Sequence, residues 1–128
     1  MGGAGIPHFY TQMMGMKLEA FIAHIRADTI LGKSFKINLN FIQLIAGIET
    51  PIFETMEDLS YVPDNWILHL RKYIIEINGS IIINDTWTPT KLRTNDLNLM
   101  AEFKSLKLFT TKELALINYW RLFYKVNY

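Results

Sequence analysis

The segment TTKELALINYWRLFY, residues 110–124, gives the clearest structural signal in the sequence. Its first four residues have the spacing of a capping box. In this motif the Thr110 hydroxyl and the Glu113 carboxylate each satisfy a backbone amide that the first helical turn leaves unpaired. The segment therefore predicts a helix that this box begins and that continues over Leu114–Tyr124.

Apolar side chains point to nearly every side of this predicted helix, and only Asn118 and Arg121 interrupt them. A surface helix of a small domain turns one apolar stripe toward the core, so these side chains cannot all be buried in one small core. A large exposed apolar patch usually marks a partner site. We therefore predict an interface, and self-association of the isolated chain, through Leu116, Trp120, Phe123 and Tyr124.

Apolar residues at three- and four-residue spacing predict further helical segments. The segments are Phe9–Asp28, Ser34–Ile48, Trp66–Ile77 and Asn95–Leu106, with a break at Ile30-Leu31-Gly32, an end of the second segment at Gly47 and a glycine cap at Asn78-Gly79. The second segment is apolar on nearly all sides, which is typical of a segment inside a larger assembly. Asn-Gly is also a hairpin signal, which leaves one short strand pair near 81–83 as an alternative. Residues 1–128 are expected to form a single, mostly α-helical unit of about four or five helices.

Composition narrows the function classes. The 128 residues carry a net charge of +1 and no cysteine, and half of them are hydrophobic. The absence of cysteine excludes disulfides and thiolate metal sites, and the small net charge gives no overall field that holds a polyanion. No histidine or carboxylate pattern matches a metal or catalytic motif, so we expect no catalytic residue, no metal site and no cofactor. The sequence shows no secretion signal and no membrane span, so we expect no membrane partner.

Basic residues interleaved with aromatic ones can follow a phosphate backbone and stack on bases. Arg71 and Lys72 are predicted to share a helix with Trp66, and Lys91 and Arg93 follow in the second half. These four residues are the candidates for a weak, local nucleic-acid contact. The alternative is that they are solvated helix faces and that Arg93 pairs with Asp96.

A series of single residues and short motifs runs through nearly the whole chain: Gly2-Gly3-Ala4-Gly5-Ile6, Arg26 with Gly32-Lys33, Gln43 with Gly47, Pro63 with Trp66 and Leu70-Arg71, Pro89 with Arg93, Asp96 and Leu99-Met100, Phe109-Thr110, and Ile117-Asn118-Tyr119 with Arg121. The series resembles the region downstream of the polymerase core in reverse transcriptases of non-LTR retrotransposons, especially polyproteins from algal and protist genomes. The resemblance implies that the opening glycines are an internal joint of a longer polyprotein. It also implies that Arg71 and Arg93 matter, through phosphate contact or through structural pairing.

The chain departs from that family at two places. The catalytic Asp-Asp box has no counterpart, and Trp120 stands where the closing Asn-Tyr-x-Arg motif often has a smaller residue such as Cys. Two-metal phosphoryl transfer needs clustered carboxylates, so we expect a non-catalytic fragment of an RNA-directed DNA polymerase that braces the polymerase or helps hold nucleic acid. The alternative is a small helical module that binds another protein through its aromatic C-terminal helix.

Overall fold

The computed structural model of the chain describes residues 5–27, 29–83 and 87–128. Within these ranges the chain forms α1 (Gly5–Ile25), α2 (Ile30–Ala46), the short 3-10 helix η1 (Ile52–Glu54), α3 (Trp66–Glu76), α4 (Leu99–Ser105) and α5 (Thr111–Tyr124). No described residue lies in a strand, and the segment 81–83 is irregular. The predicted all-α fold is therefore confirmed, and the alternative strand pair is not formed. Gly2 and Gly3 of the predicted joint lie outside the described residues.

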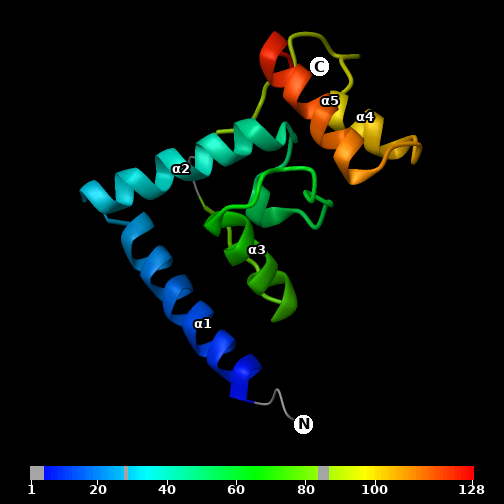
Figure 1. Cartoon of the computed structure of the whole chain (residues 1–128). Coiled ribbons are helices and arrows are strands. Elements are labelled where there is room, and N and C mark those ends of the chain that lie inside the picture. Colours follow the sequence, from blue (N-terminus) through cyan, green and yellow to red (C-terminus); the bar gives the residue numbers. More distant parts are fainter. Residues whose placement is uncertain (1–4, 28, 84–86) are drawn as a thin grey trace.

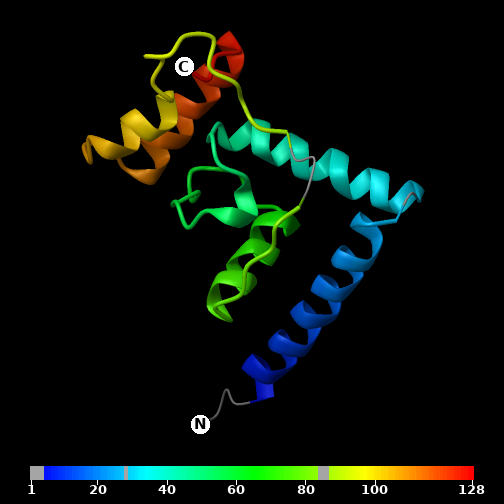
Figure 2. The ribbon, with the colours of Figure 1, turned by 180° about the vertical axis from the view of Figure 1, so that it is seen from behind.

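The helices are arranged around α2. α1 and α2 meet in a V with α3 on its inner side, and α4 and α5 pair beside the C-terminal end of α2 (Figures 1 and 2). The core of the V is aromatic: the Phe21 ring lies 5.6 Å from Phe35, 5.5 Å from Phe53 and 5.9 Å from Trp66, measured between ring centroids. Ile67 and Leu70 of α3 are fully buried, and so is Met100 of α4. α2 is thus the element against which both the V and the α4–α5 pair are positioned.

The α1–α2 connection is shorter than the sequence predicts. α2 begins at Ile30, because the Thr29 hydroxyl accepts a hydrogen bond from the Gly32 amide (3.0 Å) and caps the helix. The predicted break at Ile30-Leu31-Gly32 is therefore wrong. Gly32 lies inside the helix, where a Cβ atom would be 2.2 Å from the carbonyl oxygen of His24. The glycine marks a close approach of two helices and not a break.

The other boundaries shift by a few residues. α3 begins after Asn65, whose side chain accepts from the Leu68 amide (3.1 Å). Its last helical residue is Glu76. Two residues later the chain leaves the helix through a left-handed conformation, which Asn78 adopts (φ 55°) and not Gly79 as predicted. α4 begins at Leu99 and not at Asn95, because the Asn98 side chain caps it. Gly47 ends α2 as predicted.

Candidate protein interface

The capping box of α5 is formed as predicted. The Glu113 amide donates to the Thr110 hydroxyl (3.2 Å), and the Thr110 amide donates to the Glu113 carboxylate (3.0 Å). The Thr110 amide and the Thr110 hydroxyl both lower the pKa of the exposed Glu113 carboxyl, because a hydrogen-bond donor beside the carboxylate favours its charged form. The box fixes where α5 begins and therefore which of its side chains face the rest of the chain.

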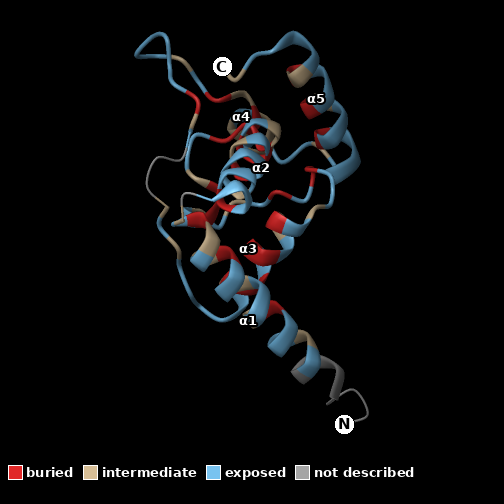
Figure 3. Ribbon diagram, turned by 90° about the vertical axis from the view of Figure 1, so that its left-hand side faces the viewer, coloured by how far each residue is buried: buried red, intermediate tan, exposed pale blue. Residues whose placement is uncertain are grey.

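The polarity of α5 is inverted relative to an ordinary surface helix. Its buried residues are Leu114, Asn118 and Arg121, which follow each other at four- and three-residue spacing. Its exposed residues include Leu116 (58% exposed), Tyr119 (60%), Trp120 (48%), Phe123 (63%) and Tyr124 (67%), which we call the α5 outer face. Figure 3 shows α5 along the edge of the molecule with its exposed surface turned outward. All four predicted interface residues thus lie on the exposed side of the helix.

The aromatic rings of the α5 outer face already contact one another. The centroid of Trp120 lies 5.6 Å from Tyr119, 5.7 Å from Phe123 and 6.3 Å from the stacked ring of Tyr124. Such pairs prefer these edge-to-face and stacked geometries and restrain each other's rotamers. The face is a preformed ridge, so a partner that covers it has less side-chain entropy to remove.

The buried side of α5 caps the C-terminal end of α2. The Arg121 guanidinium donates to the carbonyl oxygens of Leu44 (3.0 Å) and Ile45 (2.8 Å), and the Asn118 amide group also donates to Ile45 (2.9 Å). A helix leaves its last carbonyls without intrahelical partners and carries a partial negative charge at that end. A buried cation at this position supplies both hydrogen bonds and favourable electrostatics.

Two side chains from other segments complete the same cap. The buried Tyr61 hydroxyl donates to the Ala46 carbonyl, and the Asn98 amide group donates to the Gly47 carbonyl (2.7 Å). Burial raises the pKa of Tyr61 well above its usual range, which keeps the hydroxyl protonated and able to donate. Four consecutive carbonyls, residues 44–47, therefore accept five hydrogen bonds from side chains, and we call these five interactions the α2 cap.

Gln43 fixes the chain that leaves α2. Its side-chain amide donates to the carbonyls of Ile48 (3.2 Å) and Thr50 (2.9 Å), and its oxygen accepts from the Ile52 amide (2.9 Å). Gln43 is fully buried, so these bonds replace those to water. The sequence indicated that the Gln43 amide, within an apolar segment, must find hydrogen-bond partners, but it marked Asn118 and Arg121 only as members of a motif series or as interruptions in an apolar helix. The available signal for a buried polar contact was the three-residue spacing of Asn118 and Arg121 within an otherwise aromatic and aliphatic helix.

Arg71, a candidate for nucleic-acid contact, is placed inside the chain. Its guanidinium donates to the carbonyls of Ile52 (3.0 Å), Thr55 (2.8 Å) and Glu57 (2.7 Å), and it is 9% exposed. Burial lowers the pKa of this guanidinium, and the nearby Glu57 and Asp58 carboxylates oppose the shift. Of the two roles that the resemblance implies, this geometry corrects the assignment of Arg71 from phosphate contact to structural pairing.

The three other basic candidates do not form one patch. Lys72 is exposed on α3, whereas Lys91 and Arg93 lie in the loop beside the C-terminus, across α2 from α3 (Figure 1). Lys91 Nζ lies 3.8 Å from a Glu49 carboxylate oxygen. Arg93 meets Asp96 through its backbone amide, which donates to the carboxylate (2.9 Å). The structure thus keeps all three residues at the surface but places Lys72 apart from Lys91 and Arg93.

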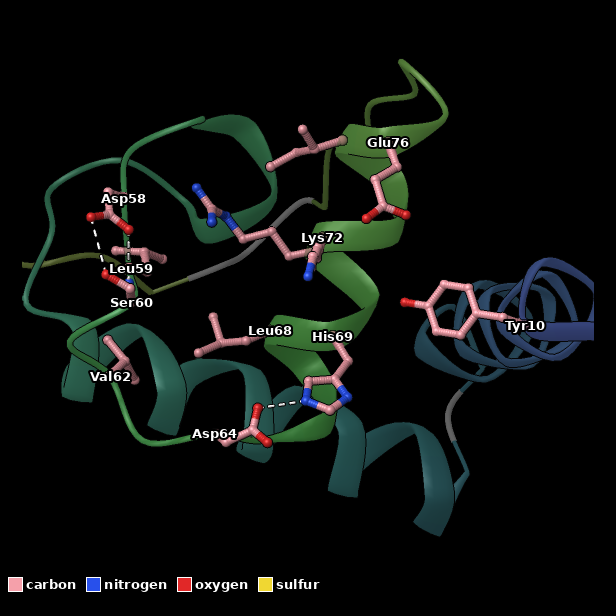
Figure 4. Close-up of a pocket in the computed structure, with 12 residues that line it drawn as sticks. Tyr10, Asp58, Leu59, Ser60, Val62, Asp64, Leu68, His69, Lys72 and Glu76 are labelled. Atoms are coloured by element: carbon pink, nitrogen blue, oxygen red, sulfur yellow. Dashed lines mark hydrogen bonds and ion pairs between the residues drawn. The ribbon is translucent and has the colours of Figure 1, made fainter. Parts of the chain in front are cut away.

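A cleft of about 770 Å³ lies between α1, α3 and the segment 58–64 (Figure 4). Tyr10 faces Lys72 and His69 across it, and His69 Nε2 lies 2.5 Å from the Asp64 carboxylate. Carboxylates and basic groups alternate around the cleft, so it has no potential of one sign that would select a charged ligand. In the described part of the chain no group of three or more metal-ligating side chains comes together.

Apolar side chains are also exposed on the two longest helices. On α2 they are Ile37, Phe41 and Leu44, and on α1 they are Phe9, Met13 and Met16. Each set has the four- and three-residue spacing of a helical stripe. None of the helices within residues 5–27, 29–83 and 87–128 is long and apolar enough to cross a membrane.

Comparison of the chain with known proteins gives no match to a family model, to a curated protein or to a solved structure.

Proposed function

We propose that this chain is a non-catalytic helical unit that braces a larger protein and docks on it through the α5 outer face. The observation that carries the proposal is the inverted polarity of α5. An arginine and an asparagine join Leu114 on its buried side, while Leu116, Trp120 and Phe123 face solvent. A helix whose only function was to close this small core would have the opposite pattern. The exposed ridge is therefore a surface for another protein.

The apolar stripes on α1 and α2 support the larger-protein part of the proposal. Three helices expose apolar stripes, and together these exceed the scattered apolar residues that an isolated domain shows. The resemblance noted in the sequence supplies the identity of the larger protein, which we propose to be the remainder of a reverse transcriptase polyprotein of a non-LTR retrotransposon. The alternative, a small interaction module that binds a separate protein, uses the same α5 outer face.

The double variant Trp120→Ser/Phe123→Ser tests the docking surface. We expect it to be more soluble than the unaltered chain and to change the free energy of unfolding by less than about 0.5 kcal/mol, because exposed side chains contribute little to folding and serine matches both residues in helix propensity. Urea unfolding followed by circular dichroism measures this, at a concentration low enough that both chains are monomers, because self-association would add to the stability of the unaltered chain alone. The matched control is Leu114→Ser on the buried side of the same helix, which should cost about 2–3 kcal/mol. If the double variant no longer unfolds cooperatively, these side chains belong to the core, and the proposal is wrong.

Nucleic-acid contact is a weaker, secondary role in this proposal. With Arg71 paired inside the chain, three of the four candidate residues remain to contact phosphates: Lys72, Lys91 and Arg93. Each phosphate neutralised contributes roughly 0.7–0.9 to the slope of log affinity against log salt concentration. We therefore expect weak, sequence-independent binding of single-stranded RNA, with a slope magnitude no larger than about 3. Fluorescence polarisation across a salt series measures it. Tight binding that hardly changes with salt would contradict the assignment.

A further inference from the structure

We infer that, in the isolated chain, the α5 outer face is covered by α5 of a second copy, with the two helices antiparallel across a two-fold axis. The inference rests on the proposed function in that it uses the same exposed face. It goes further because it names the occupant and its orientation. Three features of the described residues carry it: the area of the face, its lack of charge, and the charges at its two ends.

The area of the face is sufficient for a pair of copies. An aromatic side chain offers about 150–250 Å² of surface. Tyr119, Trp120, Phe123 and Tyr124 are about half to two-thirds exposed, so with Leu116 the face presents about 500–600 Å². In a two-fold pair the same face is buried twice, which gives about 1,000–1,200 Å², the size at which specific interfaces begin.

The face itself contains nothing that repels a second copy. Between Leu114 and Tyr124 the only charged residue is Arg121, and its guanidinium is buried in the α2 cap. Leu116, Trp120 and Phe123 follow at four- and three-residue spacing, which is the seam along which two helices pack knobs into holes. The ridge of one copy is therefore complementary to the ridge of another.

The ends of the helix favour the antiparallel orientation. Glu113 lies in the first turn and Lys125 at the C-terminal cap. If the two-fold axis passes between Tyr119 and Trp120, Leu116 of one copy lies opposite Phe123 of the other. In the same register Glu113 of one copy lies one residue from the position opposite Lys125 of the other, so opposite charges meet at both ends. A parallel pair would instead place Lys112, Glu113 and Lys125 each opposite the same residue of the other copy. Antiparallel alignment also pairs the opposite ends of the two helix dipoles.

Sedimentation equilibrium tests the pairing. The unaltered chain should show a mass that rises with concentration from 14.9 kDa toward twice that value and no further. The Trp120→Ser/Phe123→Ser variant should stay at the monomer mass, whereas Ile37→Ser, on the exposed stripe of α2, should behave as the unaltered chain does. A monomer up to about 100 µM, or a mass that grows beyond the dimer, overturns the inference. The docking proposal is judged separately by the unfolding measurements and survives the first of these outcomes.

Cysteine cross-linking tests the orientation. The chain has no cysteine of its own, so a disulfide can form only between the introduced residues. Tyr119→Cys lies next to the predicted axis, so oxidation should give a disulfide-linked dimer. In Lys112→Cys the two cysteines would be about 22 Å apart along the helices, at 1.5 Å per residue, far beyond the 7 Å that a disulfide spans between Cα atoms. The exposed Leu92→Cys gives the collisional background. Cross-linking of Lys112→Cys above that background, or of Tyr119→Cys only at background level, overturns the antiparallel arrangement.

Discussion

Replacing Arg121 with methionine should lower the free energy of unfolding by about 3–5 kcal/mol, a large part of the stability of a domain of this size. The guanidinium donates to the carbonyls of Leu44, Ile45 and Val126 and to the side-chain oxygens of Asn118 and Asn127. Methionine fills a similar volume but donates no hydrogen bond. The buried carbonyls at the end of α2 would be left without their charged partner, and α5 would lose its main attachment to α2.

Two control variants separate geometry from charge. Arg121→Lys keeps the positive charge, but the lysine ammonium group lacks the planar guanidinium that donates to several carbonyls at once. This variant should therefore lose less free energy of unfolding than Arg121→Met but remain less stable than the unaltered chain. Arg93→Met removes an exposed arginine and should change the free energy of unfolding by less than about 0.5 kcal/mol. Urea unfolding followed by circular dichroism measures all three. If Arg121→Met were as stable as Arg93→Met, the α2 cap would not hold α5 in place.

Replacing Gly47 with alanine should have the second-largest effect, a loss of about 2–4 kcal/mol. Gly47 has a φ of 67°, and this left-handed conformation costs other residues about 1–2 kcal/mol. In addition, an added Cβ atom would lie 2.6 Å from Cζ of Arg121, so the guanidinium would have to move away from its carbonyl partners. The substitution therefore damages both the end of α2 and the α2 cap.

Gly79→Ala is the matched control for this prediction. A Cβ atom at Gly79 would have its nearest neighbour at 3.5 Å, an ordinary contact, and should leave stability nearly unchanged. The double variant Gly47→Ala/Arg121→Met should be more stable than the sum of the two losses predicts, because both changes disrupt the same contacts. Additive losses in the double variant would show that Gly47 and Arg121 act independently, contrary to the geometry.

Much of the fold could be predicted because it depends on local signals. The capping box at Thr110 and Glu113, the glycine at the end of α2 and the apolar period of α3 each act within a few residues. The failures occurred where a distant element decided the structure. Gly32 looked like a break, but it lies inside α2 because the end of α1 passes too close for any side chain.

The exposed side of α5 could also be predicted, since the apolar residues of Leu114–Tyr124 cannot all share one inward stripe. The buried side could not. Asn118 and Arg121 find their partners on backbone carbonyls more than 70 residues away, and a carbonyl carries no sequence signature. The same reason explains Arg71, whose charge favoured a surface role, although its three carbonyl acceptors lie in the irregular chain around η1. Backbone acceptors that only the tertiary fold assembles are outside the reach of pattern reasoning.

The α2 cap also determines when, during synthesis, the C-terminal end of α2 can reach its final structure. The contact between Leu44 and Arg121 spans 77 positions, so at about 5–20 residues per second the ribosome adds Arg121 roughly 4–15 s after it has added Leu44. Over that interval the carbonyls of Leu44 and Ile45 lack their side-chain partners on α5, and the apolar residues that α5 covers stay exposed. A nascent chain is therefore a substrate for chaperones until α5 emerges, and the α2 cap is complete only after α5 has been synthesised.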